Sequence, residues 1–143
     1  MTEVPRKATV LNTTVLSNFA HVNHVELLLG LPRVVTVVAV STELNDGIET
    51  HQYLERALSA LEDGIPVVTP SPPAQKLEET LLETLDPGEA QALAVAAEAE
   101  GTVVTDDGDA RTVADQRGIG LTGSIGLLVR FVENDRIAAD TAD

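Results

Sequence analysis

The sequence contains no cysteine and no tryptophan, and aromatic residues make up only 2% of its 143 residues. Without cysteine, disulfide bonds and thiolate metal sites are both excluded. With so few aromatic side chains, the core must consist of Val, Leu, Ile and Ala, which suits the thin layers of an α/β fold. Stacking on aromatic rings also cannot be the main way in which this chain would hold single-stranded nucleic acid.

Long apolar runs are missing as well. No stretch approaches the roughly 18 uncharged apolar residues that a membrane span needs, and the N-terminus does not have the layout of a signal peptide. We therefore expect a cytoplasmic protein that does not enter the membrane. A length of 143 residues leaves room for one domain, so we expect residues 1–143 to form a single unit.

Basic residues are scarce: nine stand against 23 acidic residues, which gives a net charge of −14, and only two of the nine are lysines. Taken alone, this charge argues against a nucleic-acid partner, because affinity for nucleic acid comes largely from neutralising phosphates. Low lysine with abundant Asp, Glu, Ala, Val and Thr is typical of proteins from salt-loving archaea. At about 1 M salt the screening length is only about 3 Å, so a diffuse acidic surface repels little. We interpret the composition as halophilic; the alternative is an ordinary acidic protein that avoids nucleic acid.

Short apolar runs alternate with segments of helical periodicity along the whole chain. Strands are predicted at residues 8–11, 34–40, 65–68, 102–105 and 119–121. Helices are predicted after Thr13 or Thr14 as the cap (one or two helices up to Gly30), across 44–61, 77–85, 86–99, 108–117 and 125–132. This alternation indicates βαβ units. The predicted fold is therefore a three-layer α/β/α sandwich with a mainly parallel sheet of five strands.

Polar residues stand where the predicted strands end and helices begin, which is where functional groups gather in open parallel sheets. They are Asn12, Glu43, Glu89, Asp106 and Asp107, with Thr122 and Ser124 after the fifth strand. Carboxylates that share a site repel one another, and a bound cation is the usual reason to tolerate this. Ligands that are all oxygen suit Mg²⁺ or Mn²⁺. The pattern therefore favours a divalent metal site that acts on phosphate groups.

Each acidic residue also has a purely structural interpretation. Asp86-Pro87-Gly88-Glu89 resembles a helix start in which Asp86 and Glu89 form a capping box. Asp107 can cap the helix that follows it. Glu43, if it lies in a first helical turn, gains roughly 0.3–1 kcal/mol from the helix dipole. Only the joint placement of these residues at successive strand ends favours a site.

A glycine pattern near the C-terminus resembles a dinucleotide-binding loop in spacing alone. Residues 118–123 match the spacing GxGxxG. A dinucleotide-binding loop must follow a strand within an early βαβ unit, whereas these glycines flank a late strand. We expect no dinucleotide cofactor.

The segment from Leu85 to Arg136 is similar to the C-terminal half of PIN domains, in the archaeal branch allied to VapC-type toxins. The matching motifs are Gly88-Glu89-Ala90, Thr105-Asp106-Asp107 with Ala110-Arg111, and Leu121-Thr122-Gly123-Ser124-Ile125-Gly126. Near the N-terminus, Val10-Leu11-Asn12-Thr13-Thr14-Val15-Leu16 looks like the opening strand and helix of the family. The likeness spans about residues 8–137 and is thin between Asp46 and Thr84.

This resemblance implies a metal-dependent endoribonuclease, acting as the toxin of a toxin–antitoxin pair. RNA would be its substrate, an antitoxin protein its partner, and a homodimer is plausible. The metal positions of the family, for Mg²⁺ or Mn²⁺, fall on Asn12, Glu43, Glu89 and Asp107, with Asp106 adjacent.

Supporting roles follow from the same resemblance. Arg111 would bind a substrate phosphate; the alternative is an ion pair with Asp107 or Asp115. Thr105, Thr122 and Ser124 would hydrogen-bond the carboxylates or metal-bound waters. For Thr122, a helix cap is the structural alternative.

Asn12 departs from the family pattern, because PIN nucleases carry an aspartate there. An amide has nearly the same shape and offers a carbonyl oxygen, but it brings no negative charge, so metal affinity should fall. A tolerated natural variant, a natural pseudo-nuclease and an engineered inactivating change are all compatible with the sequence. The second hypothesis is therefore a PIN-like module that binds RNA or an antitoxin without cleavage.

Overall fold

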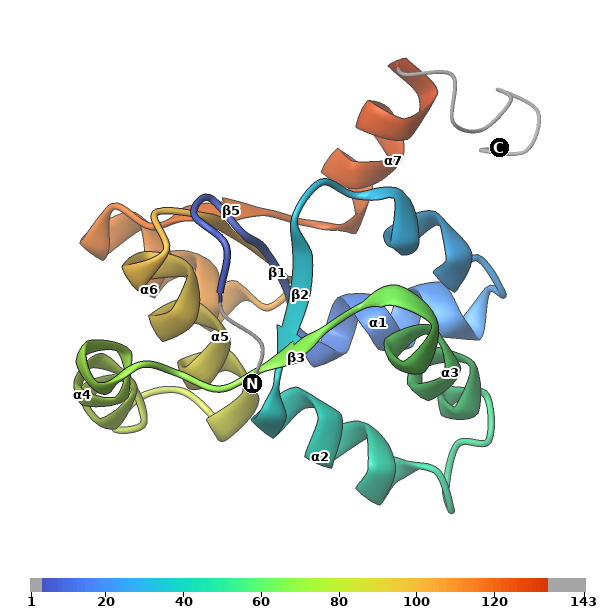
Figure 1. The fold of residues 1–143 in the computed structure, drawn as a ribbon, viewed down its shortest axis with the longest axis horizontal. Helices are drawn as coiled ribbons and strands as arrows, with labels where there is room; N and C mark the ends of the chain where they lie inside the picture. Colours follow the sequence, from blue (N-terminus) through green and yellow to red (C-terminus); the bar gives the residue numbers. More distant parts are fainter. Residues whose placement is uncertain (1–3, 134–143) are drawn as a thin grey trace.

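Short parallel strands and helices alternate along the chain in the computed structural model, which describes residues 4–133 (Figure 1). The strands are β1 (Thr9–Leu11), β2 (Val34–Val37), β3 (Val67–Val68), β4 (Thr102–Val104) and β5 (Gly120–Thr122). The helices are α1 (Thr13–His21), the 3-10 helix η1 (Val25–Gly30), α2 (Val38–Gly47), α3 (Leu54–Gly64), α4 (Pro72–Leu81), α5 (Pro87–Glu98), α6 (Gly108–Arg117) and α7 (Ser124–Glu133).

The five strands form one sheet in the order β3-β2-β1-β4-β5, and every pair of neighbours is parallel. The predicted α/β fold and its five-stranded parallel sheet are confirmed. From β1 the chain adds β2 and β3 on one side, then crosses to add β4 and β5 on the other. The strand order therefore reverses between β1 and β4. This reversal is the point at which open parallel sheets leave a crevice beyond their carboxyl ends.

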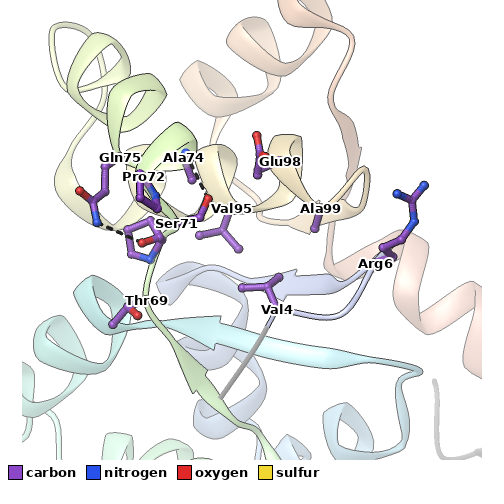
Figure 2. A pocket seen from close by; sticks show the side chains of 11 residues that line it. Val4, Arg6, Thr69, Ser71, Pro72, Ala74, Gln75, Val95, Glu98 and Ala99 are labelled. Atoms are coloured by element: carbon purple, nitrogen blue, oxygen red, sulfur yellow. Dashed lines mark hydrogen bonds between the residues drawn. The ribbon is translucent and has the colours of Figure 1, made fainter. Parts of the chain in front are cut away.

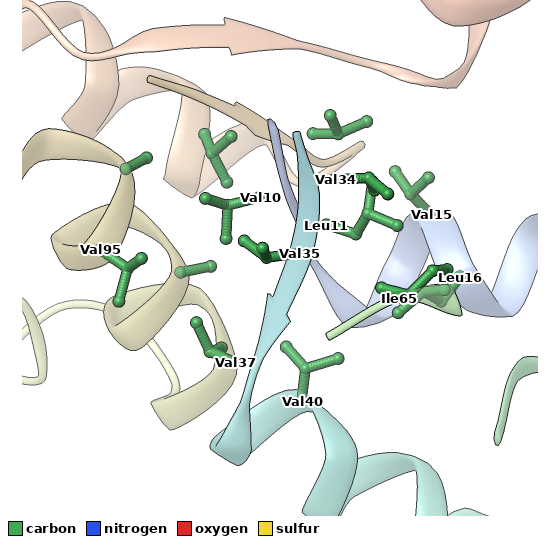
Figure 3. Packing of buried hydrophobic residues seen from close by; sticks show 14 of the residues in the cluster. Val10, Leu11, Val15, Leu16, Val34, Val35, Val37, Val40, Ile65 and Val95 are labelled. Carbon is green, nitrogen blue, oxygen red and sulfur yellow. The ribbon is translucent and has the colours of Figure 1, made fainter. Parts of the chain in front are cut away.

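Helices cover both faces of the sheet, as Figure 1 shows: α4, α5 and α6 lie to one side, and α1 and α3 to the other. Successive side chains of a strand point to opposite faces. Accordingly Val10 and Val35 lie on the side of α5, whereas Leu11 lies on the side of α1 (Figure 3). All three are buried. The core consists of aliphatic residues with only Phe19 and Phe131 as buried phenylalanines among the described residues, as the composition predicts.

Three predicted segments had wrong boundaries. The helix expected across 77–85 is α4, which begins earlier, at Pro72, because Ser71 caps it, and which ends at Leu81. The apolar run from Val34 was expected to be a strand as far as Val40, but β2 stops at Val37 and α2 begins at the next residue. A fully apolar run looks the same in a buried strand and in a buried first helical turn, so periodicity cannot separate the two. The helix expected across 44–61 is two helices, since α2 ends at Gly47 and α3 begins at Leu54. A Cβ on Gly47 would lie only 2.7 Å from the Leu54 side chain, so the two helices approach closely at this break.

The abrupt start of α2 leaves backbone donors without a local cap, because Val37 at the N-cap position has no side-chain acceptor. Gln91 of α5 supplies one: its Oε1 accepts from the backbone N–H of Ala39 at 2.9 Å. Its Nε2 donates to Glu78 of α4 at 3.0 Å. Gln91 thus joins three helices.

Among the helices of residues 4–133, none combines the length and apolar character that crossing a membrane requires.

Candidate active site

Asn12 and Thr105 meet where the strand order reverses. Asn12 directly follows β1, and Thr105 directly follows β4. The parallel register places Leu11 beside Val104, so the next residues of both strands emerge side by side. The backbone N–H of Asn12 donates to the carbonyl of Val104 at 2.9 Å, and its side-chain Nδ2 donates to Thr105 Oγ1 at 2.9 Å. Both residues are buried, at 2% and 0% exposure.

The Thr105 hydroxyl organises this corner. Besides Asn12, it accepts from the backbone N–H of Asp107 at 3.2 Å. A hydroxyl oxygen has two acceptor positions, so the Thr105 proton points to Thr14 Oγ1, 3.3 Å away. The other side-chain oxygen of Asn12, Oδ1, is buried and has no hydrogen-bond partner among the described residues. An unsatisfied buried acceptor costs about 1–3 kcal/mol, and a cation or a hydrogen-bond donor bound to this oxygen would remove that cost.

Glu89 and Asp107 form a pair of carboxyl groups. Glu89 is the third residue of α5, and Asp107 is the N-cap of α6. Burial, a hydrogen bond with Asp107 and the charges of Asp86 and Asp107 together raise the pKa of Glu89 to about 8. Asp107 also caps α6, because its Oδ1 accepts from the N–H groups of Asp109 and Ala110 at 2.8 and 3.0 Å. The structural prediction for Asp107 is therefore confirmed, and it does not exclude a second role for the same carboxyl.

Glu43 was expected in the first turn of a helix, but it is the sixth residue of α2. Its carboxylate instead reaches the N-terminus of a different helix: Oε1 accepts from the backbone N–H of Gly88 in α5 at 3.1 Å. Its other oxygen, Oε2, accepts from the Thr13 hydroxyl at 2.8 Å. The favourable helix dipole is thus that of α5. A Cβ on Gly88 would lie 2.4 Å from Glu43 Oε1, so only glycine allows this approach.

Contacts and chain neighbours link the four predicted metal positions into a closed ring. From Asn12 the ring passes through Thr105 to Asp107, then through the carboxyl pair to Glu89. Gly88, the chain neighbour of Glu89, donates its backbone N–H to Glu43. The Thr13 hydroxyl also donates to Glu43, and Thr13 is the chain neighbour of Asn12. These contacts place the segments that carry the four positions next to one another at the carboxyl ends of β1 and β4. No three acidic or histidine side chains of residues 4–133 already stand in an arrangement that would coordinate a metal.

Asp106 has a different surrounding from Asp107. Its carboxylate accepts from the backbone N–H and the hydroxyl of Ser124 and from Asn18 Nδ2. Burial alone would raise the pKa of Asp106, but these hydrogen bonds and the nearby Arg111 charge lower it. Asp106 thus ties the end of β4 to α1 and α7. A role of Asp106 as a metal ligand stays a prediction.

Of the remaining predicted residues, Ser124 hydrogen-bonds a carboxylate as expected, that of Asp106. Arg111 is exposed and pairs with neither Asp107 nor Asp115 within 4 Å; its charge acts on Asp106. Thr122 ends β5, and α7 begins two residues later. A Cβ on Gly126 would meet the Thr122 hydroxyl at 2.5 Å, so this side chain packs under the first turn of α7.

Three residues of the ring and its support were not recognised from the sequence. Thr13 and Thr14 were expected only as caps of α1, whereas Asn12 occupies the N-cap position and both hydroxyls bind neighbouring segments. Asn18 lies four residues after Thr14, on the same face of α1, and this spacing of polar side chains was the available signal. Gly88 was part of a recognised motif, but its role depends on the approach of Glu43.

A hollow of about 610 Å³ lies at the other end of α5 from Glu89 and is separate from the ring (Figure 2). Val4, the loop before α4 and the last turns of α5 surround it, with Val95, Glu98 and Ala99 on the α5 side. None of the predicted metal positions lines it.

Comparison with known proteins agrees with this geometry. A family model described as a PIN domain (DUF3368) matches residues 8–142. Comparison with curated protein sequences gives no match. Among solved structures, PAE2754 from Pyrobaculum aerophilum is similar with a TM-score of 0.63 and 16% identity, covering 88% of this chain and 97% of that one.

Two toxin–antitoxin structures are also similar. VapBC-1 from nontypeable Haemophilus influenzae has a TM-score of 0.59 and 14% identity, with 81% of this chain and 97% of that chain covered. VapBC2 from Rickettsia felis, bound to a DNA fragment from its promoter, has a TM-score of 0.54 and 17% identity, with coverages of 81% and 98%. At these identities the likeness concerns the fold, while the family match covers nearly the whole chain. The chain belongs to the PIN domain family.

Proposed function

We propose that this protein is a metal-dependent endoribonuclease. The observation that supports the proposal is the set of contacts that links the segments of Glu43, Glu89 and Asp107 to Asn12 at the reversal of strand order, together with the carboxyl pair of Glu89 and Asp107. A close pair of carboxyls that holds a proton at neutral pH is a costly arrangement, and a cation would relieve it. Perturbed carboxyls in such a crevice are typical of functional sites.

The residues present fit Mg²⁺ or Mn²⁺. All available ligands are oxygens, and Mg²⁺ commonly binds through one or two carboxylates while it keeps several waters. Asp107 and Glu89 would supply the carboxylates, and the unpartnered Oδ1 of Asn12 would supply a neutral oxygen. The arrangement therefore does not need three preformed ligands. When bound, such an ion would lower the pKa of a water molecule and stabilise charge on the cleaved phosphodiester.

The protein residues would prepare this chemistry. Glu89 must lose its proton before it can bind a cation, so its raised pKa couples metal binding to proton release. Glu43 is held in one orientation by the Gly88 N–H and the Thr13 hydroxyl, and it stays beside the first turn of α5. The Thr105 hydroxyl fixes the Asn12 amide, so that Oδ1 faces away from it.

The test is Mn²⁺-dependent cleavage of structured RNA by the wild-type chain and by Asp107→Asn and Glu89→Gln, each also in excess EDTA. Cleavage should require the metal and should fall at least 100-fold in both variants. Binding of Mn²⁺, followed by calorimetry, should weaken in parallel. Cleavage that persists in EDTA, or that survives both substitutions, would contradict the proposal.

A second function, RNA binding without cleavage, is favoured by one observation: an amide stands at position 12 where an aspartate would add a charge. Asn12→Asp separates the two. If only the aspartate variant cleaves, the natural chain is a binding module. If the wild type cleaves and the variant is merely faster, the nuclease proposal stands.

We further propose that an antitoxin protein is the partner and that the activity is toxic to its host. The support is the fold shared with VapBC-1 and VapBC2. Expression of the wild type should arrest growth of a host cell, and Asp107→Asn should not. Equal growth under expression of both proteins, at equal protein levels, would argue against a toxin.

A further inference from the structure

A second hollow, of about 380 Å³, lies at the opposite end of the strands from the ring. Residues just before β1, β2 and β4 line it, together with part of α7. We call it the basic hollow, because three of its lining residues are Lys7, Arg33 and Arg130. These are three of only nine basic residues in a chain with 23 acidic ones. All three are exposed.

Within residues 4–133, no carboxylate forms an ion pair with the cations of the basic hollow, Lys7, Arg33 and Arg130. Glu100, the only acidic residue among the described residues that line the hollow, forms an ion pair with Arg6 at 3.2 Å. The hollow therefore carries a local excess of positive charge. In so acidic a chain, like charges gathered without counter-charges indicate an anion from outside.

The backbone around the hollow is held in an uncommon conformation. Lys7, Arg33 and Glu100 have φ values of 58°, 53° and 55°, in the left-handed region that side-chain-bearing residues rarely adopt. Each costs roughly 1–2 kcal/mol, and such residues cluster where function requires a fixed geometry. Two hydrogen bonds hold them: the backbone N–H of Lys7 donates to the Ala99 carbonyl at 2.7 Å, and the side-chain Nε of Arg33 donates to the Lys7 carbonyl at 3.2 Å. The cations thus project from a rigid rim.

We propose that the basic hollow binds a phosphate of the RNA backbone, at a distance from the cleavage site. The inference rests on the proposed function for its choice of anion. Lys7 and Asn12 are five residue steps apart along the chain, or at most about 16 Å at roughly 3.3 Å per step. The two sites lie at opposite ends of the buried central strand β1, so one RNA would contact both by passing around the outside of the domain. Such an anchor gives a chain of net charge −14 a local site of attraction for RNA where its overall field repels.

The test compares two double variants that lose the same charge. Lys7→Gln with Arg130→Gln removes two cations of the hollow, neither of which makes a side-chain hydrogen bond among the described residues. Lys76→Gln with Arg117→Gln removes two exposed cations from α4 and α6. Binding of a fluorescent single-stranded RNA is measured by anisotropy in EDTA, so that no cleavage occurs, between about 50 and 200 mM KCl. Thermal unfolding shows that both variants are folded.

Each phosphate contact on a single strand contributes about 0.7 to the slope of log affinity against log salt. Because the hollow is proposed to bind one phosphate, the hollow variant should lose about 0.7 from this slope, so that salt weakens its binding about 2.6-fold less than it weakens wild-type binding over that range. The control variant should keep the wild-type slope. Equal slopes in both doubles, or no metal-independent RNA binding by the wild type, would overturn the basic hollow. A changed slope together with no Mn²⁺-dependent cleavage would instead refute the nuclease and leave the hollow in place.

Discussion

The approach of Glu43 to Gly88 makes the substitution Gly88→Ala a sharp test of the ring. The added Cβ would stand 2.4 Å from Glu43 Oε1 and 3.1 Å from Cδ, whereas ordinary contacts are 3.4–4 Å. The carboxylate must therefore withdraw by about 1 Å, which breaks its hydrogen bond with the Gly88 N–H. Hydrogen bonds to charged groups contribute about 1.5–3 kcal/mol. The higher helix propensity of alanine returns up to about 1 kcal/mol. We expect a net loss of about 1–2 kcal/mol in the free energy of unfolding.

Gly108→Ala is the matched control, since Gly108 also lies in a first helical turn after an aspartate cap, and a Cβ there has nothing within 4 Å. It should be neutral or more stable than the wild type by up to about 1 kcal/mol. Urea unfolding of the metal-free proteins measures both. In a Glu43→Ala background the obstacle is gone, so Gly88→Ala should then behave like Gly108→Ala. If Gly88→Ala is as stable as Gly108→Ala in the wild-type background, the close approach of Glu43 is not real.

Three further predictions concern the carboxyl groups. Because Glu89 must release its proton to bind a cation, the apparent affinity for Mn²⁺ should rise about tenfold per pH unit up to about pH 8 and then level off. Calorimetry in several buffers measures this affinity. An affinity that does not change with pH would show that Glu89 is not a ligand. Without metal, the folded pKa of Glu89 lies above its unfolded value of 4.5, so its contribution to stability is complete below that value and is lost as the pH rises through about 8. Glu89→Gln should therefore remove most of the loss of stability between pH 6 and 9, and an unchanged loss would argue against a buried, protonated Glu89. The pKa of Asp106 is lowered, so its contribution to stability is present above pH 3.8 and is lost as the pH falls through the folded pKa. Ser124→Ala should therefore reduce stability by about 1–2 kcal/mol at pH 7 and by less at pH 3, as thermal unfolding can show. An equal loss at both pH values would mean that the ionised Asp106 carboxylate is not what Ser124 stabilises.

The order of elements was predictable because each strand and helix carries its own hydrophobic period, and a chain that alternates the two has few topologies open to it. The boundary between β2 and α2 was not predictable, since Val38 and Val40 are apolar whichever structure they adopt. The start of α2 is supported by a residue distant in sequence: Gln91, 52 residues after Ala39, accepts the backbone N–H of Ala39. A single sequence does not reveal a partner at that separation.

For the site, the neighbourhood of Asn12, Thr105 and Asp107 follows from the rule that parallel strands end at one edge. The direction in which each carboxylate points does not. Asp106 and Asp107 are adjacent and chemically identical, yet one faces Ser124 of α7 and the other faces Glu89 of α5. Glu43 was placed at the correct edge for the wrong reason, because the dipole that stabilises it belongs to α5 and not to α2.

The Thr105 hydroxyl has a consequence for how this protein can evolve. A hydroxyl can donate a hydrogen bond as well as accept one. The Thr105 hydroxyl now accepts from the Asn12 amide, and it could donate to a carboxylate at position 12 by rotating its O–H bond. Asparagine and aspartate codons differ by a single nucleotide. Under the proposed nuclease function, a lineage carrying this corner could therefore pass between a weaker and a stronger catalyst in one mutational step, in either direction, without first losing its fold.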